Sequence, residues 1–261
     1  MADRLLVSTT TSDLTVNVEL GKRLGVGLEL QGFADPLTLA QRFDEVLGFH
    51  QTALRDFHQP VALHGAFYDM SSASPDPAVV SLTRRRYRQN LCAAAELGAA
   101  YVVFHLNYLG AMRLPNYRQG WLQRQIEFWA DFTRDAARLD MPVLLENSWE
   151  DDPTLITDVV ESVASPYLRA CLDVAHATLY SSISLSHWIE AFRPHLVCAH
   201  LNNHDGELDL HWPLDQGVLD YGQILPLLRR LPQAPLMVLE MNEPAFIQAS
   251  LPHFLLGKQR V

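Results

Sequence analysis

Eight short apolar segments, separated by longer helix-like segments, constrain the fold of this chain more than any other feature. Each is four or five residues long and is bounded by Pro, Gly or polar residues, which is typical of buried strands. They span residues 5–8, 26–30, 60–64, 101–105, 142–146, 170–174, 196–200 and 236–240. Apolar strands that alternate with helices indicate a parallel sheet covered by helices.

The segments between these strands have the pattern of helices. Residues 77–97 are rich in good helix formers and end at Gly98, a suitable residue after a helix C-terminus, and residues 121–139 and 153–163 behave alike. Eight such units close naturally into a barrel, and 261 residues fit one barrel of this kind. We therefore predict an α/β fold, a single (β/α)8 TIM barrel, as one domain over residues 1–261. An open doubly wound sheet is the alternative, but no GxGxxG follows a strand.

Charge and cysteine content narrow the class of protein. Twenty Lys and Arg against 30 Asp and Glu give a net charge of −10, which argues against nucleic acid as the main partner, because such binding uses a basic surface. The three cysteines form no CxxC pair, as in reduced intracellular proteins. No apolar run reaches the roughly 18 residues that span a membrane, and polar residues 8–12 interrupt the first run before it could serve as a signal peptide. We expect a cytoplasmic protein without a membrane partner.

Acidic residues and histidines occupy the C-terminal ends of seven successive predicted strands. They are Glu29, His64, His105, Glu146, Asp173, His200 and Glu240. Barrel enzymes build their active sites at this end of the strands, so these side chains should converge. Buried carboxylates and imidazoles are costly unless they are paired or bind a ligand, and both residue types bind divalent metals. The pattern therefore predicts a metal site at the barrel mouth.

Two further clusters extend this set. Asp173 and His176 are three residues apart, so that a strand-end carboxylate and an imidazole in the following turn can both face the mouth. Asp209 and His211 are two apart in a loop, and their side chains point the same way if that loop is extended. At the rim we expect Glu29 and Asn107 to contact substrate. The aromatic candidates to line the pocket are Tyr68, Trp149 and Trp212.

An ordered set of motifs resembles a known superfamily of barrels. The segments 64–68, 103–105, 145–147, 171–177, 200–203, 209–214 and 239–240 look like the xylose-isomerase-like TIM-barrel superfamily. That superfamily contains sugar isomerases and epimerases as well as apurinic endonucleases of the endonuclease IV type (AP endonuclease family 2). The likeness runs from about the third strand to the eighth. It implies a xylose-isomerase-like barrel.

The resemblance also implies a ligand set. In endonuclease IV-like members nine ligands hold three zinc ions, and this chain has all nine residue types in order. By resemblance, one metal would be held by His64, His105 and Glu146, the second by Glu146, Asp173, His200 and Glu240, and the third by His176, Asp209 and His211. Epimerase-type members use mainly Glu146, Asp173, His200 and Glu240 around one ion of Mn, Co or Mg, and the two glutamates move substrate protons.

The surplus ligands favour hydrolysis over isomerisation. Several divalent ions can clamp both oxygens of a phosphoester, whereas proton transfer beside a carbonyl needs one ion and well-placed bases. The related epimerases also tend to carry an Arg six residues after the strand-seven histidine, where this chain has Gly206. We therefore expect zinc-dependent hydrolysis of a small sugar-, nucleotide- or corrinoid-type phosphoester, with Glu146 and Glu240 as the catalytic residues.

Three alternatives stay open. The loop around residues 204–221 resembles superfamily members described as sugar phosphate isomerases or epimerases, which favours a sugar or sugar phosphate isomerase with one metal and two glutamates. An apurinic endonuclease is disfavoured by the net charge and by the lack of Gly-rich and basic insertions. A barrel that only binds a ligand is the third. In each enzymatic case the partner is a phosphorylated or sugar-like small molecule, and the sequence does not predict an oligomeric state.

Overall fold

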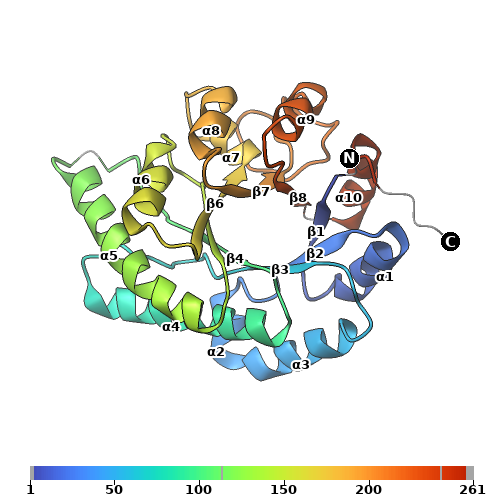
Figure 1. Cartoon of the computed structure of the whole chain (residues 1–261), viewed down its shortest axis with the longest axis horizontal. Helices are drawn as coiled ribbons and strands as arrows, with labels where there is room; N and C mark the ends of the chain where they lie inside the picture. The colour runs from blue at the N-terminus through green and yellow to red at the C-terminus, as the bar shows by residue number, and fades with distance from the viewer. Residues whose placement is uncertain (1–2, 113, 242, 257–261) are drawn as a thin grey trace.

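Eight parallel strands close into one barrel in chain order (Figure 1). The computed structural model describes residues 3–112, 114–241 and 243–256. The strands are β1 Leu5–Thr9, β2 Gly27–Leu30, β3 Val61–His64, β4 Val102–His105, β5 Val143–Glu146, β6 Leu168–Asp173, β7 Leu196–Leu201 and β8 Leu236–Leu239. The predicted TIM barrel is confirmed. The predicted domain of residues 1–261 also includes residues 1–2 and 257–261, which lie outside the described residues.

Helices surround this barrel (Figure 1). They are α1 Leu14–Leu24, α2 Pro36–Gln41, α3 Phe43–Ala53, α4 Pro77–Glu96, α5 Tyr117–Arg138, α6 Thr154–Val163, α7 Val174–Leu179, α8 Leu185–Phe192, α9 Tyr221–Arg229 and α10 Pro244–Ser250, followed by a short 3-10 turn at Leu251–His253. Local sequence sets several ends. Asp76 caps α4 by accepting a hydrogen bond from the Ala78 amide (2.8 Å), and Gly98 turns the chain with φ of 66°.

The sixth strand differs slightly from the prediction. It runs from Leu168 to Asp173, two residues earlier at its start than expected, with an irregular register between Ala170 and Cys171. Its end is set by Asp173, whose carboxylate accepts a hydrogen bond from the His176 amide (2.6 Å) and so caps α7. Asp173 is thus a helix cap as well as a strand-end carboxylate.

Side chains alternate between the two sides of the barrel wall. Outward-facing residues join the helices in a large core that includes Trp129, Trp188 and Phe104. Inside the barrel a second, smaller buried cluster is formed by Leu6, Ala62, Tyr101, Val103, Leu144, Cys171, Cys198 and Val238. Because strand side chains repeat every two residues, the next inward positions are His64, His105, Glu146, Asp173 and His200 on five strands and Glu240 directly after β8. The barrel interior therefore changes from apolar to polar toward the C-terminal ends of its strands.

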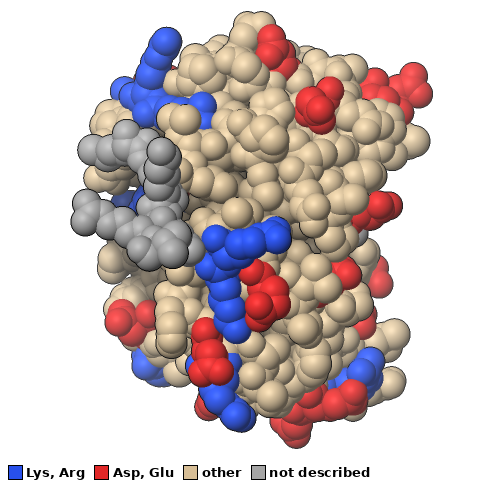
Figure 2. Space-filling view, turned by 90° about the vertical axis from the view of Figure 1, so that its right-hand side faces the viewer, with Lys and Arg blue, Asp and Glu red and all other residues tan. Residues whose placement is uncertain are grey.

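The surface seen in Figure 2 mixes charges of both signs. On the described part of this face Lys and Arg side chains lie next to Asp and Glu rather than forming one basic patch. This face therefore lacks, in its described part, the continuous basic stripe that nucleic-acid binding uses. None of the described helices combines the length and apolar character required to cross a membrane.

Candidate metal centre

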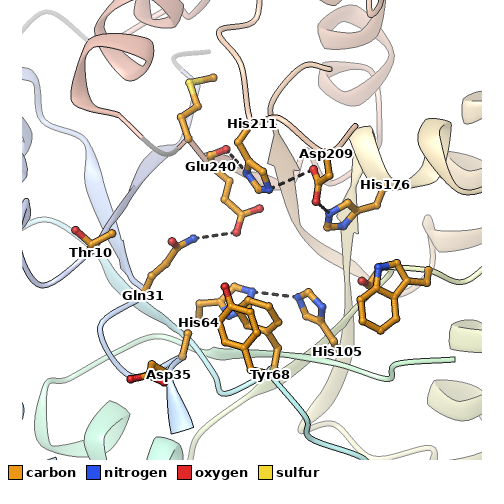
Figure 3. Close-up of a pocket in the computed structure, with 15 residues that line it drawn as sticks. Thr10, Gln31, Asp35, His64, Tyr68, His105, His176, Asp209, His211 and Glu240 are labelled. Carbon is orange, nitrogen blue, oxygen red and sulfur yellow. Dashed lines mark hydrogen bonds and ion pairs between the residues drawn. The ribbon is translucent and has the colours of Figure 1, made fainter. Parts of the chain in front are cut away.

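A cavity of about 420 Å³ opens at the C-terminal end of the strands (Figure 3). Six of the nine predicted ligands line it: His64, His105, His176, Asp209, His211 and Glu240. The remaining three, Glu146, Asp173 and His200, are fully buried behind them. Side chains far apart in the sequence thus converge as predicted, and their donor atoms fall into three groups.

The central group consists of Glu146, Asp173, His200 and Glu240. One potential ligand atom from each lies within 4.8 Å of the others. The Nδ1 atom of His200 is 3.1 Å from an oxygen of Glu146 and 3.0 Å from an oxygen of Glu240. The Glu240 oxygen that faces His200 accepts no hydrogen bond, and neither does the buried Glu146 oxygen that faces His64 and His105. Such oxygens, converging with an imidazole, fit a divalent cation.

A second group shares Glu146 with the first. The Nε2 atoms of His64 and His105 are 3.2 Å apart, and they lie 3.4 and 3.1 Å from the same Glu146 oxygen. Since the other Glu146 oxygen faces His200, this carboxylate stands between two groups of donors. A bridging carboxylate has this arrangement.

The third group is His176, Asp209 and His211. Their potential ligand atoms also lie within 4.8 Å of one another. The two Asp209 oxygens are 3.1 Å from Nε2 of His176 and 3.3 Å from Nε2 of His211 (Figure 3). His211 adopts a left-handed backbone conformation with φ of 49°, which turns its ring toward the cavity.

Three of these histidines are oriented by main-chain carbonyls. The Nδ1 atoms of His64, His176 and His211 lie 2.9, 3.0 and 2.9 Å from the carbonyl oxygens of Gly65, Asn147 and Glu240. A carbonyl oxygen only accepts, so each Nδ1 carries the hydrogen and donates it. Nε2 is then the nitrogen that faces the neighbouring carboxylates, and its lone pair is free for a metal once any proton on it is lost. A metal-ligating histidine is oriented in this way, by a partner on its other nitrogen.

The protonation of the site reflects its burial and its opposite charges. Burial raises the pKa of Asp173 to about 6, with a further contribution from the Glu146 carboxylate. Burial would also raise the pKa of Glu240, but the facing imidazole of His200 lowers it to about 2. Burial would lower the pKa of His211, yet the carboxylate of Asp209 raises it to about 9. Imidazolium protons therefore balance the carboxylates, and a divalent cation would displace those protons.

Two residues expected to contact substrate lie elsewhere. Glu29 is fully buried beneath His200 and does not line the cavity. The side chain of Asn107 donates hydrogen bonds to the carbonyl oxygens of Phe67 and Met70 (3.3 and 2.7 Å), so it anchors the loop after β3. Both positions differ from the expectation. The strand register explains the first, because Glu29 pairs with Ala62, two residues below the end of β3.

The sequence patterns identify the other cavity residues only in part. Tyr68 and Trp149 line the cavity as anticipated, with 57% and 45% of their surface exposed, whereas Trp212 does not line it. Gln31 lines the cavity without having been predicted. Its side-chain amide donates a hydrogen bond to Glu240 (2.9 Å) from the position directly after β2. A strand-end pattern limited to Asp, Glu and His omits this residue, whereas one extended to amides would include it.

The fold and this convergence of donors define a TIM barrel with a candidate metal centre. The sequence profile of a family described as "Xylose isomerase-like TIM barrel" matches residues 33–255. The chain therefore belongs to the xylose isomerase-like TIM barrel family. A search of curated protein sequences found no match.

Solved structures add to this assignment. The TTHB071 protein from Thermus thermophilus, solved after soaking with ZnCl2, is 30% identical to the chain, with 95% of each chain covered and a TM-score of 0.77. A D-tagatose 3-epimerase-like protein is 18% identical, with 95% of each chain covered and a TM-score of 0.80. The 3-keto-D-glucoside 4-epimerase YcjR from E. coli is 16% identical, with 96% of this chain and 97% of that chain covered and a TM-score of 0.72.

The names of these solved structures describe those proteins. The two more distant structures are named as a sugar epimerase and a protein like one, although their identities to this chain show the fold alone. The comparisons establish the family and the fold of this chain, and both expected activities are compatible with them.

Proposed function

We propose that the protein is a metal-dependent isomerase or epimerase of a small sugar or sugar derivative. The observation that carries the proposal is the central group, in which Glu146 and Glu240 both face Nδ1 of His200. This group places two carboxylates beside the position of one cation. Two carboxylates around one ion are what proton transfer next to a carbonyl requires.

The central group has the donors for a divalent ion. Three carboxylates and one imidazole suit Zn, Mn, Co or Mg, and the ZnCl2-soaked relative supports zinc among them. A bound ion would polarise the substrate carbonyl and make the adjacent C–H bond more acidic. The protein side chains would then move the proton.

Glu240 is well placed for this proton transfer. It lines the cavity and remains 6% exposed, while the Gln31 amide holds one of its oxygens at 2.9 Å. This hydrogen bond fixes the carboxylate against the substrate position. Glu146 is fully buried and does not itself line the cavity. It would serve as the second base for a substrate bound at the central group.

The walls of the cavity suit a small sugar-like ring. Phe67 stacks on His105 with ring centroids 5.3 Å apart, and Tyr68 lies on Phe67 at 4.0 Å. The loop that carries these rings is fixed by Asn107. Apolar ring faces beside polar donors match the two sides of a sugar.

Solvent exchange tests this function directly. We would incubate the metal-loaded protein in D₂O with ketoses, aldoses and their phosphates and follow deuterium uptake by NMR. We expect deuterium at the carbon next to the carbonyl for at least one substrate, and loss of this uptake in Glu240→Gln. Absence of exchange with every sugar would contradict the proposal.

Hydrolysis of a phosphoester is the second candidate, and one specific observation favours it. The nine donors form three groups, with Glu146 between two of them, which is more than one ion needs. Several neighbouring ions would stabilise the attacking and leaving oxygens of a phosphoester. Release of p-nitrophenol from bis(p-nitrophenyl) phosphate, together with two or three ions per chain and no deuterium uptake, would favour this candidate.

A further inference from the structure

His200 is oriented differently from three of the other histidines of the site. His64, His176 and His211 donate Nδ1–H to main-chain carbonyls, whereas Nδ1 of His200 faces the carboxylates of the central group. Its other nitrogen, Nε2, points into the barrel and lies 3.1 and 3.3 Å from the two oxygens of Glu29. Both side chains are fully buried. The orienting group of this histidine is therefore a carboxylate.

Glu29 is itself held in place. The hydroxyl of Tyr101 donates a hydrogen bond to it (3.2 Å), and the same hydroxyl is 3.2 Å from Sγ of Cys198. Cys171 and Cys198 are further polar neighbours on this interior side of His200. Among the residues that the structure describes, the ion-pair partner of Glu29 is His200 rather than a Lys or Arg. A carboxylate buried without a Lys or Arg is costly unless it accepts strong hydrogen bonds.

We propose that Glu29, held by Tyr101, is the positioning residue of the central metal site. It accepts the Nε2–H hydrogen of His200 and so fixes both the ring orientation and the tautomer. The lone pair of Nδ1 is then directed to the point between Glu146 and Glu240. This inference rests on the proposed function, because it requires an ion at the central group.

The geometry also predicts which ion is affected. Glu29 contacts His200, while three histidines of the other two groups, His64, His176 and His211, are oriented by main-chain carbonyls. A carboxylate partner makes an imidazole a stronger ligand, and loss of such a partner typically weakens metal binding about 10- to 100-fold. The weakening should therefore be confined to the central site.

Titration of the metal-free protein with Co²⁺ tests the inference without an activity assay. The visible absorption of bound Co²⁺ reports the ligand field, and the steps of the titration can be assigned with two variants. The step lost in Asp173→Ala marks the central site, and the step lost in Asp209→Ala marks the third group. We would then compare Glu29→Ala, Glu29→Gln and Tyr101→Phe with the wild type.

We expect Glu29→Ala to weaken the central step about 10- to 100-fold and to shift its absorption band, while the Asp209-dependent step keeps its dissociation constant. Glu29→Gln should recover part of the loss, since its amide oxygen still accepts from Nε2. If Glu29→Ala fails to fold, Glu29→Gln and Tyr101→Phe carry the test through a smaller shift of the same band.

The two ways of failing are distinguishable. A wild-type protein that binds no Co²⁺ at an Asp173-dependent step would refute the metal site and the proposed function with it. The other failure affects only the inference. It would be seen if the wild type shows the central step and all folded Glu29 and Tyr101 variants keep its dissociation constant and its absorption spectrum.

Discussion

Two layers of the barrel interior, two residues apart on the same strands, have opposite character. On β5 the inward side chains are Leu144 and then Glu146. On β8 the inward side chain is Val238, and Glu240 directly follows the end of that strand. Apart from Glu29 and the hydroxyl of Tyr101, the lower layer is closed by apolar packing. The upper layer brings together carboxylates and imidazoles that an apolar interior would not tolerate unpaired. Residues that pack the core and residues that form the candidate site thus lie only two positions apart. Substituting the lower and the upper residue of each pair allows a matched comparison.

The largest difference is expected between Glu240→Gln and Val238→Ala. Loss of a general base or acid typically lowers a rate about 10²- to 10⁴-fold, so Glu240→Gln should reduce deuterium exchange by at least this order. Val238→Ala, two residues below on the same face, should lower thermal stability but retain exchange per folded molecule. Equal losses of activity in the two variants would remove the distinction between the layers.

A second pair, Leu144→Ala and Glu146→Gln, compares stability. Leu144 is fully buried, so its truncation should lower the free energy of unfolding of the metal-free protein by about 2–5 kcal/mol. Zinc should still raise the melting temperature of this variant, because ligands that bind only the folded state stabilise it. In Glu146→Gln, by contrast, zinc should raise the melting temperature only a little. Calorimetry with and without zinc measures both, and a full zinc response in Glu146→Gln would be the contrary result.

The pH dependence of metal binding distinguishes the third group. The pKa of His211 is raised to about 9 by Asp209, so in the metal-free protein its proton adds stability below the ordinary pKa of 6.5, and this contribution is lost as pH rises to about 9. Metal must displace that proton. Affinity at the third group should therefore rise about tenfold per pH unit between 6.5 and 9 for each imidazolium proton released. Titrations at several pH values would measure this slope, and a flat profile would show that His211 is not a ligand.

The smallest effect is expected at the cavity mouth. Tyr68 is 57% exposed, so Tyr68→Ala should change stability by less than about 0.5 kcal/mol. If its ring contacts substrate, KM should rise several-fold while kcat and metal content stay close to wild type. Tyr167→Phe serves as a control that should leave KM unchanged, because Tyr167 directly precedes β6 and so lies at the end of the barrel opposite to the cavity.

The sequence predicted the barrel and the convergence of its candidate ligands because both depend on a local repeat. Each apolar run marks a strand, and its last inward residue marks the rim. Six of the seven strand-end residues named in this way lie in the upper layer, and for His64, His105 and Glu146 the strand ends where predicted. The rule needs no knowledge of how neighbouring strands are aligned.

The rule does not predict the register between neighbouring strands or the conformation of the loops. Glu29 looks like another strand-end carboxylate, but β2 is shifted so that Glu29 pairs with Ala62 and Gln31 occupies the rim. Asn107 has a left-handed backbone with φ of 56°, and this conformation directs its amide to the neighbouring loop. Pairing between strands and the path of a loop are set by long-range packing, which single-residue patterns do not contain.

Metal content per chain is the most direct test of the central claim that the upper layer of the barrel is a metal site. Elemental analysis of the wild type and of Asp173→Ala, both purified without chelator, would provide it. The account predicts at least one divalent ion per wild-type chain and the loss of one ion in Asp173→Ala. A wild-type protein that carries no divalent ion and takes up none from added zinc, manganese or cobalt would contradict it.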